Sequence, residues 1–459
     1  MSAIPENPLL NQNLTDFYHS FRNGTLSSEK VTQQYLKRIN ALDPELGAYE
    51  YVAAEQAIQT ARAMDQLVAT GVDLGPLMGV PISIKDVFNI QGLPAPTVGS
   101  KVDLSTVFDI KTEGSFIKAL RAAGCVILGQ TKTVEFCLGI PGVSAPRGTP
   151  KNPHDPDIHR IPGGSSSGSA VAVAAGLCAF AIGTDTGGSV RVPAAFNGIF
   201  SLKISSGIWP TDGVFPLDPK LDSIGLLTRT AEDAQTAYHA INSSLYGYTY
   251  QSNKPVIKIN RLIFGKPENY FFDGLSETVQ TAIEQALNKL TKVGVTVDDC
   301  HLPGAEKRER YFPVSLPVEL LAFLGKDFFQ KNKDIIDPII ATRIESALQS
   351  QTLDFISLEK ERQEAIVAAV DSFQGYDAWI TPATADVAPP LTEFEDSELA
   401  MKHALGMTRN SQPANYLDLC GVSMPIESSR LPVGLQLMAP AGHESRLLAI
   451  AAACEKIVK

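Results

Sequence analysis

The sequence has few cysteines, and they follow no pattern that would hold a metal ion or build a disulfide framework. Six cysteines are spread over 459 residues, and no two of them form a CxxC pair. Zinc sites and disulfide scaffolds both depend on closely spaced cysteines. We therefore expect reduced, mostly buried thiols and no bound zinc.

The chain also lacks a long hydrophobic run, a secretory leader and an excess of positive charge. Its longest apolar stretch, residues 170–183, is interrupted by glycine and is shorter than the roughly 20 residues that span a bilayer. Residues 1–14 contain no positive region followed by an apolar one, so we expect a cytoplasmic protein. A net charge of −11 argues against binding of a phosphate backbone. We expect neither a membrane nor a nucleic acid as partner.

What is present is the composition of an ordinary globular chain, with 44% hydrophobic and 19% charged residues. Apolar periodicity predicts a helix that starts at Ser27 or Ser28 and stops at Asp43–Pro44. Further helices are expected over residues 53–70, 116–123, 170–177, 276–293 and 335–373. Strands are expected over residues 78–85, 125–129, 180–185, 256–264 and 377–382. This alternation favours an α/β sheet core. The simplest organisation is one domain over residues 1–459, with a catalytic core at 60–235 and a variable helical, substrate-side region at about 300–375.

Two segments rich in glycine and serine carry the strongest functional signal. Gly163–Ser169 reads Gly-Gly-Ser-Ser-Ser-Gly-Ser, and Asp185–Arg191 reads Asp-Thr-Gly-Gly-Ser-Val-Arg. They can gather hydroxyls and unobstructed amides around one point, which acyl transfer requires, because a serine nucleophile needs a base and the oxyanion needs donors. We predict a serine hydrolase whose oxyanion hole is formed by backbone amides before and at Ser189.

Lysine is a better candidate than histidine for the base. All seven histidines lie outside the two glycine- and serine-rich segments. Lys85 ends the apolar run Val80–Ile84, and a desolvated lysine loses its charge more easily and can then accept a proton. Asp86 would point to the opposite face if the strand continues, so it need not hold Lys85 in the charged form.

Taken together, these segments resemble the amidase signature family of serine amidases. The resemblance is carried by Ile84–Asp86, Gly163–Ser169 and residues 183–194, and it extends through residues 198–203, 221–234 and 431–437. Residues 240–375 match weakly. It implies a single large α/β/α domain with a central mixed, twisted sheet covered by helices, and a reaction that uses no cofactor.

The resemblance also implies a role for each motif residue. Ser189 would be the nucleophile, Ser165 a serine on a cis peptide bond that relays a proton, and Lys85 the base. The oxyanion hole would be lined by the amides of Thr186, Gly187, Gly188 and Ser189. Support of the motifs is expected from Gly163, Gly164, Ser166, Asp185 and Arg191. For the last two, a structural ion pair is a better interpretation than substrate recognition. Ser167 stands where many family members have glycine, and we assign it no catalytic role.

Other interpretations of the first segment are weaker. A glycine–serine run by itself is most often a linker or a turn, but here a second motif is coupled to it. A phosphate-binding loop would need GxxxxGK[ST], which is absent. Gly164–Gly168 formally satisfies GxSxG, which would make Ser166 the nucleophile of an α/β-hydrolase elbow. That elbow must follow a strand directly, and residues 158–162 make a poor strand.

The sequence thus predicts an amidohydrolase that cleaves an anilide, a primary amide or a carbamate-type bond, with ester or urethane hydrolysis as side activities. The expected partner is the small-molecule substrate. The sequence leaves the formation of a homodimer undecided. The alternative is the glutaminase subunit of a tRNA-dependent amidotransferase, and a non-catalytic binding homologue is a third interpretation. Apolar side chains in residues 312–329 suit a hydrophobic acyl or aryl site, although helix packing explains them equally well. Gln436, His443 and Cys420 carry no functional signal.

Overall fold

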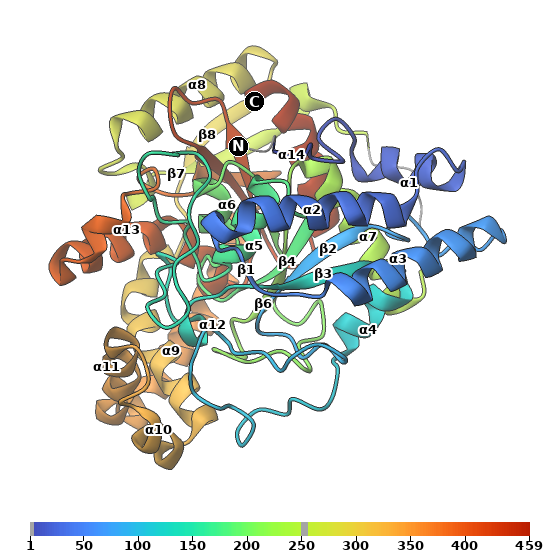
Figure 1. The fold of residues 1–459 in the computed structure, drawn as a ribbon. Helices are drawn as coiled ribbons and strands as arrows, with labels where there is room; N and C mark the ends of the chain where they lie inside the picture. The colour runs from blue at the N-terminus through green and yellow to red at the C-terminus, as the bar shows by residue number, and fades with distance from the viewer. Residues whose placement is uncertain (1–3, 249–255) are drawn as a thin grey trace.

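A mixed sheet of 11 strands runs through the part of the chain that the computed structural model describes, residues 4–248 and 256–459, with helices on both sides (Figure 1). The strands are β1 (Tyr49–Val52), β2 (Pro81–Lys85), β3 (Val126–Thr131), β4 (Phe180–Asp185), β5 (Phe200–Lys203), β6 (Ser223–Thr228), β7 (Ile263–Pro267), β8 (Thr296–Cys300), β9 (Ala378–Pro382), β10 (Cys420–Ile426) and β11 (Val433–Ala439). The helices are α1 (Leu14–Arg22), α2 (Ser28–Leu46), α3 (Ala54–Ala69), α4 (Ser115–Ala122), α5 (Ser167–Ala174), α6 (Arg191–Phe196), α7 (Ala231–Tyr246), α8 (Glu277–Lys292), α9 (Arg308–Leu324), α10 (Lys326–Asn332), α11 (Pro338–Ser346), α12 (Thr352–Ser372), α13 (Ser397–Tyr416) and α14 (Glu444–Val458).

The strand order is β1-β3-β2-β4-β6-β5-β10-β11-β9-β7-β8. Strand β2 pairs in parallel with β3 and β4, and β7 pairs in parallel with β8 and β9. The other neighbouring strands pair antiparallel. The mixed α/β sheet expected from the sequence is therefore confirmed.

The three parallel strands β3, β2 and β4 bring the two functional segments to one edge of the sheet. Carboxyl ends of parallel neighbours point the same way, so Lys85 at the end of β2 lies beside the last residues of β4, and its Nζ reaches Thr184 Oγ1. Every residue of β2 and β4 is buried, which explains why these strands show no polar alternation. The order of the strands thus places the lysine next to the turn that carries Ser189.

Helix α5 begins within the first glycine- and serine-rich segment, earlier than the expected residues 170–177. It runs from Ser167 to Ala174 with its first seven residues buried, and its small side chains let it pack closely on β4. Gly168 is needed here because a Cβ atom on it would lie 2.5 Å from the amide nitrogen of Lys132. The serines therefore lie in the turn and first residues of a helix rather than in a linker.

Two expected element boundaries are wrong. Helix α2 does not stop at Pro44 but continues to Leu46, and Gly47 ends it with a φ of 62°. Proline removes only one amide donor, and the buried face of α2, with Val31, Tyr35 and Ile39, holds the helix on the core. The strand expected over residues 256–264 is also wrong: β7 starts only at Ile263, where its partner β8 begins at Thr296.

The region expected to be helical is confirmed as helical, although it is divided. Helices α9, α10, α11 and α12 lie together at the lower left of Figure 1, and α9 contacts the other three. The expected helix over residues 335–373 is interrupted between α11 and α12. The role of this region on the substrate side stays a prediction.

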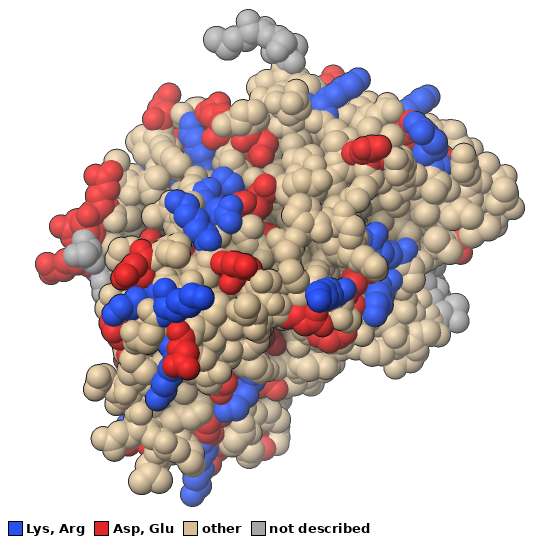
Figure 2. All heavy atoms as spheres, turned by 60° about the horizontal axis from the view of Figure 1, so that its bottom comes forward, with Lys and Arg blue, Asp and Glu red and all other residues tan. Residues whose placement is uncertain are grey.

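The surface turned forward in Figure 2 carries acidic and basic side chains side by side, and neither sign dominates that face. Across residues 4–248 and 256–459, no helix is both long enough and apolar enough to cross a bilayer.

Candidate active site

Lys85 is fully buried at the end of β2, and its amine is held by two hydroxyl groups. Its Nζ donates hydrogen bonds of 2.8 Å to Ser165 Oγ and of 2.8 Å to Thr184 Oγ1. Burial lowers the pKa of Lys85, because the charged amine loses its hydration, and the Cys137 thiol and more distant carboxylates oppose this only in part. The environment therefore favours the neutral amine, the form that can accept a proton.

The two glycine- and serine-rich segments lie against each other. The peptide bond between Gly164 and Ser165 is cis, as the resemblance implies. The Ser166 amide donates to the Ser189 carbonyl at 3.2 Å, and Thr133 Oγ1 donates to the Ser165 carbonyl at 3.0 Å. Ser189 is nearly buried, with 4% of its surface exposed. The structure thus brings together Lys85, Ser165 and the turn that carries Ser189.

The turn at Ser189 presents fewer free amides than expected. The amide of Gly188 donates to Asp185 Oδ1 at 2.8 Å, so it is not available to a substrate oxygen. Gly188 has a φ of 116°, which a residue with a side chain rarely adopts. Among the hydrogen bonds of the described residues, none uses the amides of Thr186, Gly187 or Ser189. The candidate oxyanion hole therefore consists of these three amides, and the inclusion of Gly188 is corrected.

Asp185 and Arg191 form a fully buried, two-pronged ion pair that holds this turn. Arg191 Nε donates to Asp185 Oδ2 at 3.1 Å, and Nη2 donates to Oδ1 at 3.0 Å. Burial alone would raise the pKa of Asp185, but the guanidinium of Arg191 holds it well below its usual range. The carboxylate also accepts the amides of Gly188 and Val190. This geometry is that of the structural ion pair expected from the sequence.

Several residues that shape the site carry no signal in the sequence. Asn415 Nδ2 donates to Asp185 Oδ1 at 2.8 Å, and Ser411 Oγ donates to the Gly187 carbonyl at 2.9 Å. Gln436 Oε1 accepts from Arg191 Nη1 at 2.8 Å. These contacts join positions more than 200 residues apart, so no local pattern marks them. Thr184 could have been found, because it precedes Asp185 on the strand that lies beside Lys85.

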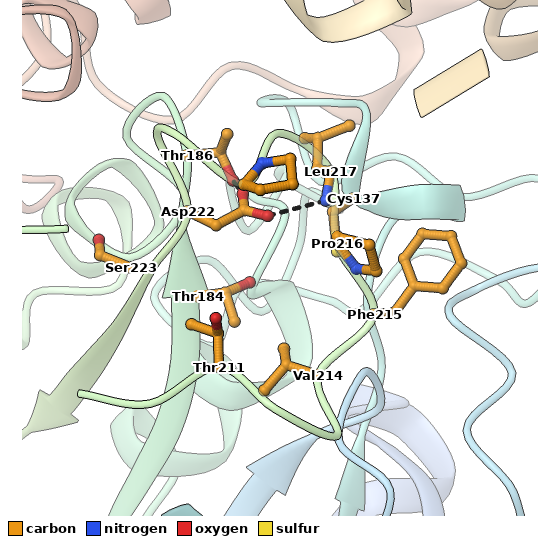
Figure 3. Close-up of a pocket in the computed structure, with 11 residues that line it drawn as sticks. Cys137, Thr184, Thr186, Thr211, Val214, Phe215, Pro216, Leu217, Asp222 and Ser223 are labelled. Atoms are coloured by element: carbon orange, nitrogen blue, oxygen red, sulfur yellow. Dashed lines mark hydrogen bonds between the residues drawn. The ribbon is translucent and has the colours of Figure 1, made fainter. Parts of the chain in front are cut away.

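A cavity of about 40 Å³ lies beside Thr184, whose hydroxyl accepts a hydrogen bond from Lys85. This volume has room for a few water molecules. Figure 3 shows Cys137, Thr184, Thr186 and Asp222 around it. The carboxylate of Asp222 faces the segment at Leu217, whose amide donates to Oδ2 at 2.9 Å, while Thr186 Oγ1 donates to Oδ1 at 2.5 Å. Burial raises the pKa of Asp222 to about 7. A second titratable group therefore borders the same cavity as Thr184, which is a hydrogen-bond partner of Lys85.

The remaining motif residues serve the local structure. Strand β2 ends at Lys85, so the condition for the expected direction of Asp86 is not met, but its carboxylate is bound elsewhere: it accepts from Gln130 Nε2 at 3.2 Å and from Thr97 Oγ1 at 2.5 Å. Gly163 has a φ of 70°, and the Gly164 amide donates to the Ile140 carbonyl at 2.6 Å.

The other two serines of the first segment bond backbone carbonyls. Ser166 Oγ donates to the Thr184 carbonyl at 3.2 Å, and Ser167 Oγ donates to the Lys132 carbonyl at 3.4 Å. No strand directly precedes Ser166. This geometry argues against Ser166 as an elbow nucleophile.

All six cysteines are free, and five of them are buried. Within the described ranges, no group of three or more His, Cys, Asp or Glu side chains is placed to hold a metal ion.

Comparison with known proteins gives consistent matches over nearly the whole chain. The family model described as Amidase matches residues 30–448. A 2-amino-5-chloromuconic acid deaminase from Comamonas testosteroni is 34% identical over 421 residues, which cover 91% of this chain and 90% of that protein. A glutamyl-tRNA(Gln) amidotransferase subunit from Acidothermus cellulolyticus is 33% identical, and the match covers 94% of this chain and 91% of that protein.

Solved structures of amidases have the same fold as this chain. A crystal structure of an amidase superposes with a TM-score of 0.86 at 26% identity, covering 98% of this chain and 100% of its own. The native peptide amidase from Stenotrophomonas maltophilia superposes with a TM-score of 0.77 at 27% identity, covering 98% of each chain.

Proposed function

This chain belongs to the amidase signature family of amidohydrolases, and from that membership we propose that it cleaves a carboxylic amide through an acyl-enzyme on Ser189. The substrate class we propose is an anilide, a primary amide or a carbamate-type compound. Lys85 acts as the base, and Ser165 passes the proton between Lys85 and Ser189. The single observation that supports this proposal best is the buried Lys85 amine, 2.8 Å from Ser165 Oγ.

In the first half of the proposed reaction, the neutral Lys85 amine takes the hydroxyl proton of Ser165 as Ser165 Oγ takes the proton of Ser189. Ser189 Oγ then forms a bond to the carbonyl carbon of the substrate. The negative charge that develops on the carbonyl oxygen is met by the free amides of Thr186, Gly187 and Ser189. When the carbon–nitrogen bond breaks, the proton returns through Ser165 to the leaving amine or ammonia.

In the second half, the same relay activates water. Water attacks the ester carbon of the acyl-enzyme, and its proton passes through Ser165 to Lys85. The ester bond to Ser189 breaks, Ser189 Oγ regains a proton, and the carboxylic acid leaves. Burial of Lys85 helps both halves because the neutral amine is then populated without a strong external base.

The pH dependence of the reaction reports on Lys85. Because burial lowers the pKa of Lys85, and because only the neutral amine accepts a proton, kcat/KM is expected to rise with pH and then level off. The midpoint should lie below the ordinary lysine value of about 10.4. The measurement is a pH–rate profile with a substrate that does not itself titrate, such as an aryl anilide.

Asp222 provides the control for that profile. Its pKa of about 7 means that its own ionisation falls within the measured range. If the rise of kcat/KM toward alkaline pH (the alkaline limb of the profile) comes from loss of a proton by Lys85, the Asp222→Asn variant should still show this limb. Loss of the limb in this variant, or an acid optimum in the parent enzyme, would contradict the role of Lys85.

A second candidate function is the glutaminase subunit of a tRNA-dependent amidotransferase, favoured by relatives of that name over more than 90% of the chain. The two candidate functions are distinguished by measuring hydrolysis of five compounds by the purified chain and by its Ser189→Ala variant. The compounds are an aryl anilide, an aliphatic amide, an aryl carbamate, an aryl ester and glutamine. We expect the purified chain to hydrolyse at least one of the first three in a Ser189-dependent manner. Hydrolysis of glutamine alone, or of nothing, would favour the amidotransferase function.

A further inference from the structure

The space beside Gly187 is bounded by side chains from two helices that are distant in the sequence. A Cβ atom on Gly187 would lie 3.2 Å from Phe312 Cε1, 3.5 Å from Gln412 Cγ and 3.7 Å from Gln412 Nε2. Phe312 belongs to α9 and Gln412 to α13. Since the amide of Gly187 belongs to the candidate oxyanion hole, these two side chains lie next to the place where a substrate carbonyl would bind.

The side-chain amide of Gln412 has a fixed orientation. Arg308 Nη1 donates to Gln412 Oε1 at 2.9 Å. A guanidinium group can only donate hydrogen bonds, so the oxygen of the amide must face Arg308 and the nitrogen must face away from it. Both side chains are nearly buried, with 8% of Gln412 and 5% of Arg308 exposed. Gln412 Nε2 is therefore held as a donor beside the Gly187 turn.

This donor has no acceptor among the residues that the structure describes. None of their hydrogen bonds uses Gln412 Nε2, although the side chain is more than nine-tenths buried. Arg308 brings positive charge to the same corner, and its ion-pair partner Glu309, 3.2 Å away, is largely exposed. Gln412 Nε2 is not one of the buried, unpaired side-chain atoms of the described residues, so this donor keeps some exposed surface and an oxygen of a ligand can reach it.

We propose that Gln412 is a specificity-determining residue whose Nε2 donates a hydrogen bond to a second oxygen, of carbonyl or carboxylate type, on the acyl part of the substrate. The ring of Phe312 covers the carbon chain between this oxygen and the scissile carbonyl. This inference rests on the proposed function, since Gly187 places Gln412 beside the oxyanion hole. It narrows the substrate class to amides whose acyl group carries an acceptor oxygen a few bonds from the bond that is cleaved.

Three amides of similar length test the proposal through kcat/KM: pentanamide, 4-oxopentanamide and succinamic acid. The enzyme is expected to prefer 4-oxopentanamide to pentanamide by about tenfold or more, because the latter leaves the donor unpaired. Gln412→Leu should abolish this preference by lowering kcat/KM for 4-oxopentanamide about tenfold more than kcat/KM for pentanamide. Gln412→Glu keeps an oxygen for Arg308 but loses the donor, so it should also abolish the preference for 4-oxopentanamide over pentanamide. Its kcat/KM should fall most for succinamic acid, because two carboxylates would then face each other.

The matched control is Gln280→Leu on the exposed face of α8, which should leave all three rates unchanged. A merely structural role for Gln412 would lower the rates of pentanamide and 4-oxopentanamide by the same factor, and that result would overturn the proposal. So would a parent enzyme that shows no preference between these two amides.

Binding of the product acids separates this inference from the proposed reaction. Calorimetry of 4-oxopentanoate and pentanoate with Ser189→Ala needs no turnover. Tighter binding of 4-oxopentanoate that is lost in Ser189→Ala/Gln412→Leu supports the role of Gln412, even if no amide is hydrolysed and the proposed function fails. Equal binding of the two acids contradicts the role of Gln412, whether or not hydrolysis depends on Ser189.

Discussion

Replacement of Ser189 by alanine is expected to lower kcat by about 10⁴-fold or more, because the variant lacks the oxygen that forms the acyl-enzyme. KM should change little, since the amides of Thr186 and Gly187 do not depend on the side chain of Ser189. The measurement is steady-state hydrolysis of the best substrate of the panel. An unchanged thermal unfolding midpoint would show that the loss is chemical and not structural.

Ser166→Ala is the matched control for this result. Ser166 lies in the same cluster, but its Oγ donates to the Thr184 carbonyl. Loss of one neutral hydrogen bond should leave kcat within about tenfold of the parent value. If instead Ser166→Ala were inactive and Ser189→Ala active, Ser166 would be the nucleophile, as in an α/β-hydrolase elbow.

Arg191→Met is expected to cause the largest loss of stability. The substitution removes the guanidinium that binds the fully buried Asp185 through two hydrogen bonds. An uncompensated buried carboxylate of this kind costs about 3–5 kcal/mol. Urea denaturation followed by circular dichroism measures the free energy of unfolding, and activity should fall as well because Asp185 holds the amides of Gly188 and Val190.

Two further variants identify the cause of that loss. Lys456→Ala breaks an exposed ion pair with Glu232 and should leave the unfolding midpoint unchanged. Adding Asp185→Asn to Arg191→Met removes the unpaired charge and should recover part of the lost stability. A double variant no more stable than Arg191→Met would mean that packing, and not the buried charge, dominates at this position.

Residues at the ends of predicted strands could be placed from the sequence. Lys85 and Asp185 each end a buried apolar run, and parallel strand ends meet at one edge of a sheet. The motif that contains Ser189 follows Asp185 directly. That Lys85 lies close to Ser189 was itself expected only from the resemblance to the amidase signature family, and the strand order now gives the physical reason for it.

The rest of the site depends on contacts that no local pattern encodes. Whether the Gly188 amide is free depends on the direction in which the Asp185 carboxylate points, and that is set by Arg191 and Asn415. Gln412 and Phe312 reach Gly187 from helices that follow it by more than 100 residues. Their positions result from the packing of α9 and α13 against the turn, which the periodicity of each helix does not reveal.

The nucleophile can be identified most directly by covalent labelling. The enzyme is incubated with an aryl sulfonyl fluoride, which sulfonylates an activated serine, and the modified peptide is located by tandem mass spectrometry. We expect a single adduct on Ser189 that forms much more slowly in Lys85→Met and is absent in Ser189→Ala. An adduct on Ser166, or labelling of Ser189 at the same rate without Lys85, would contradict it.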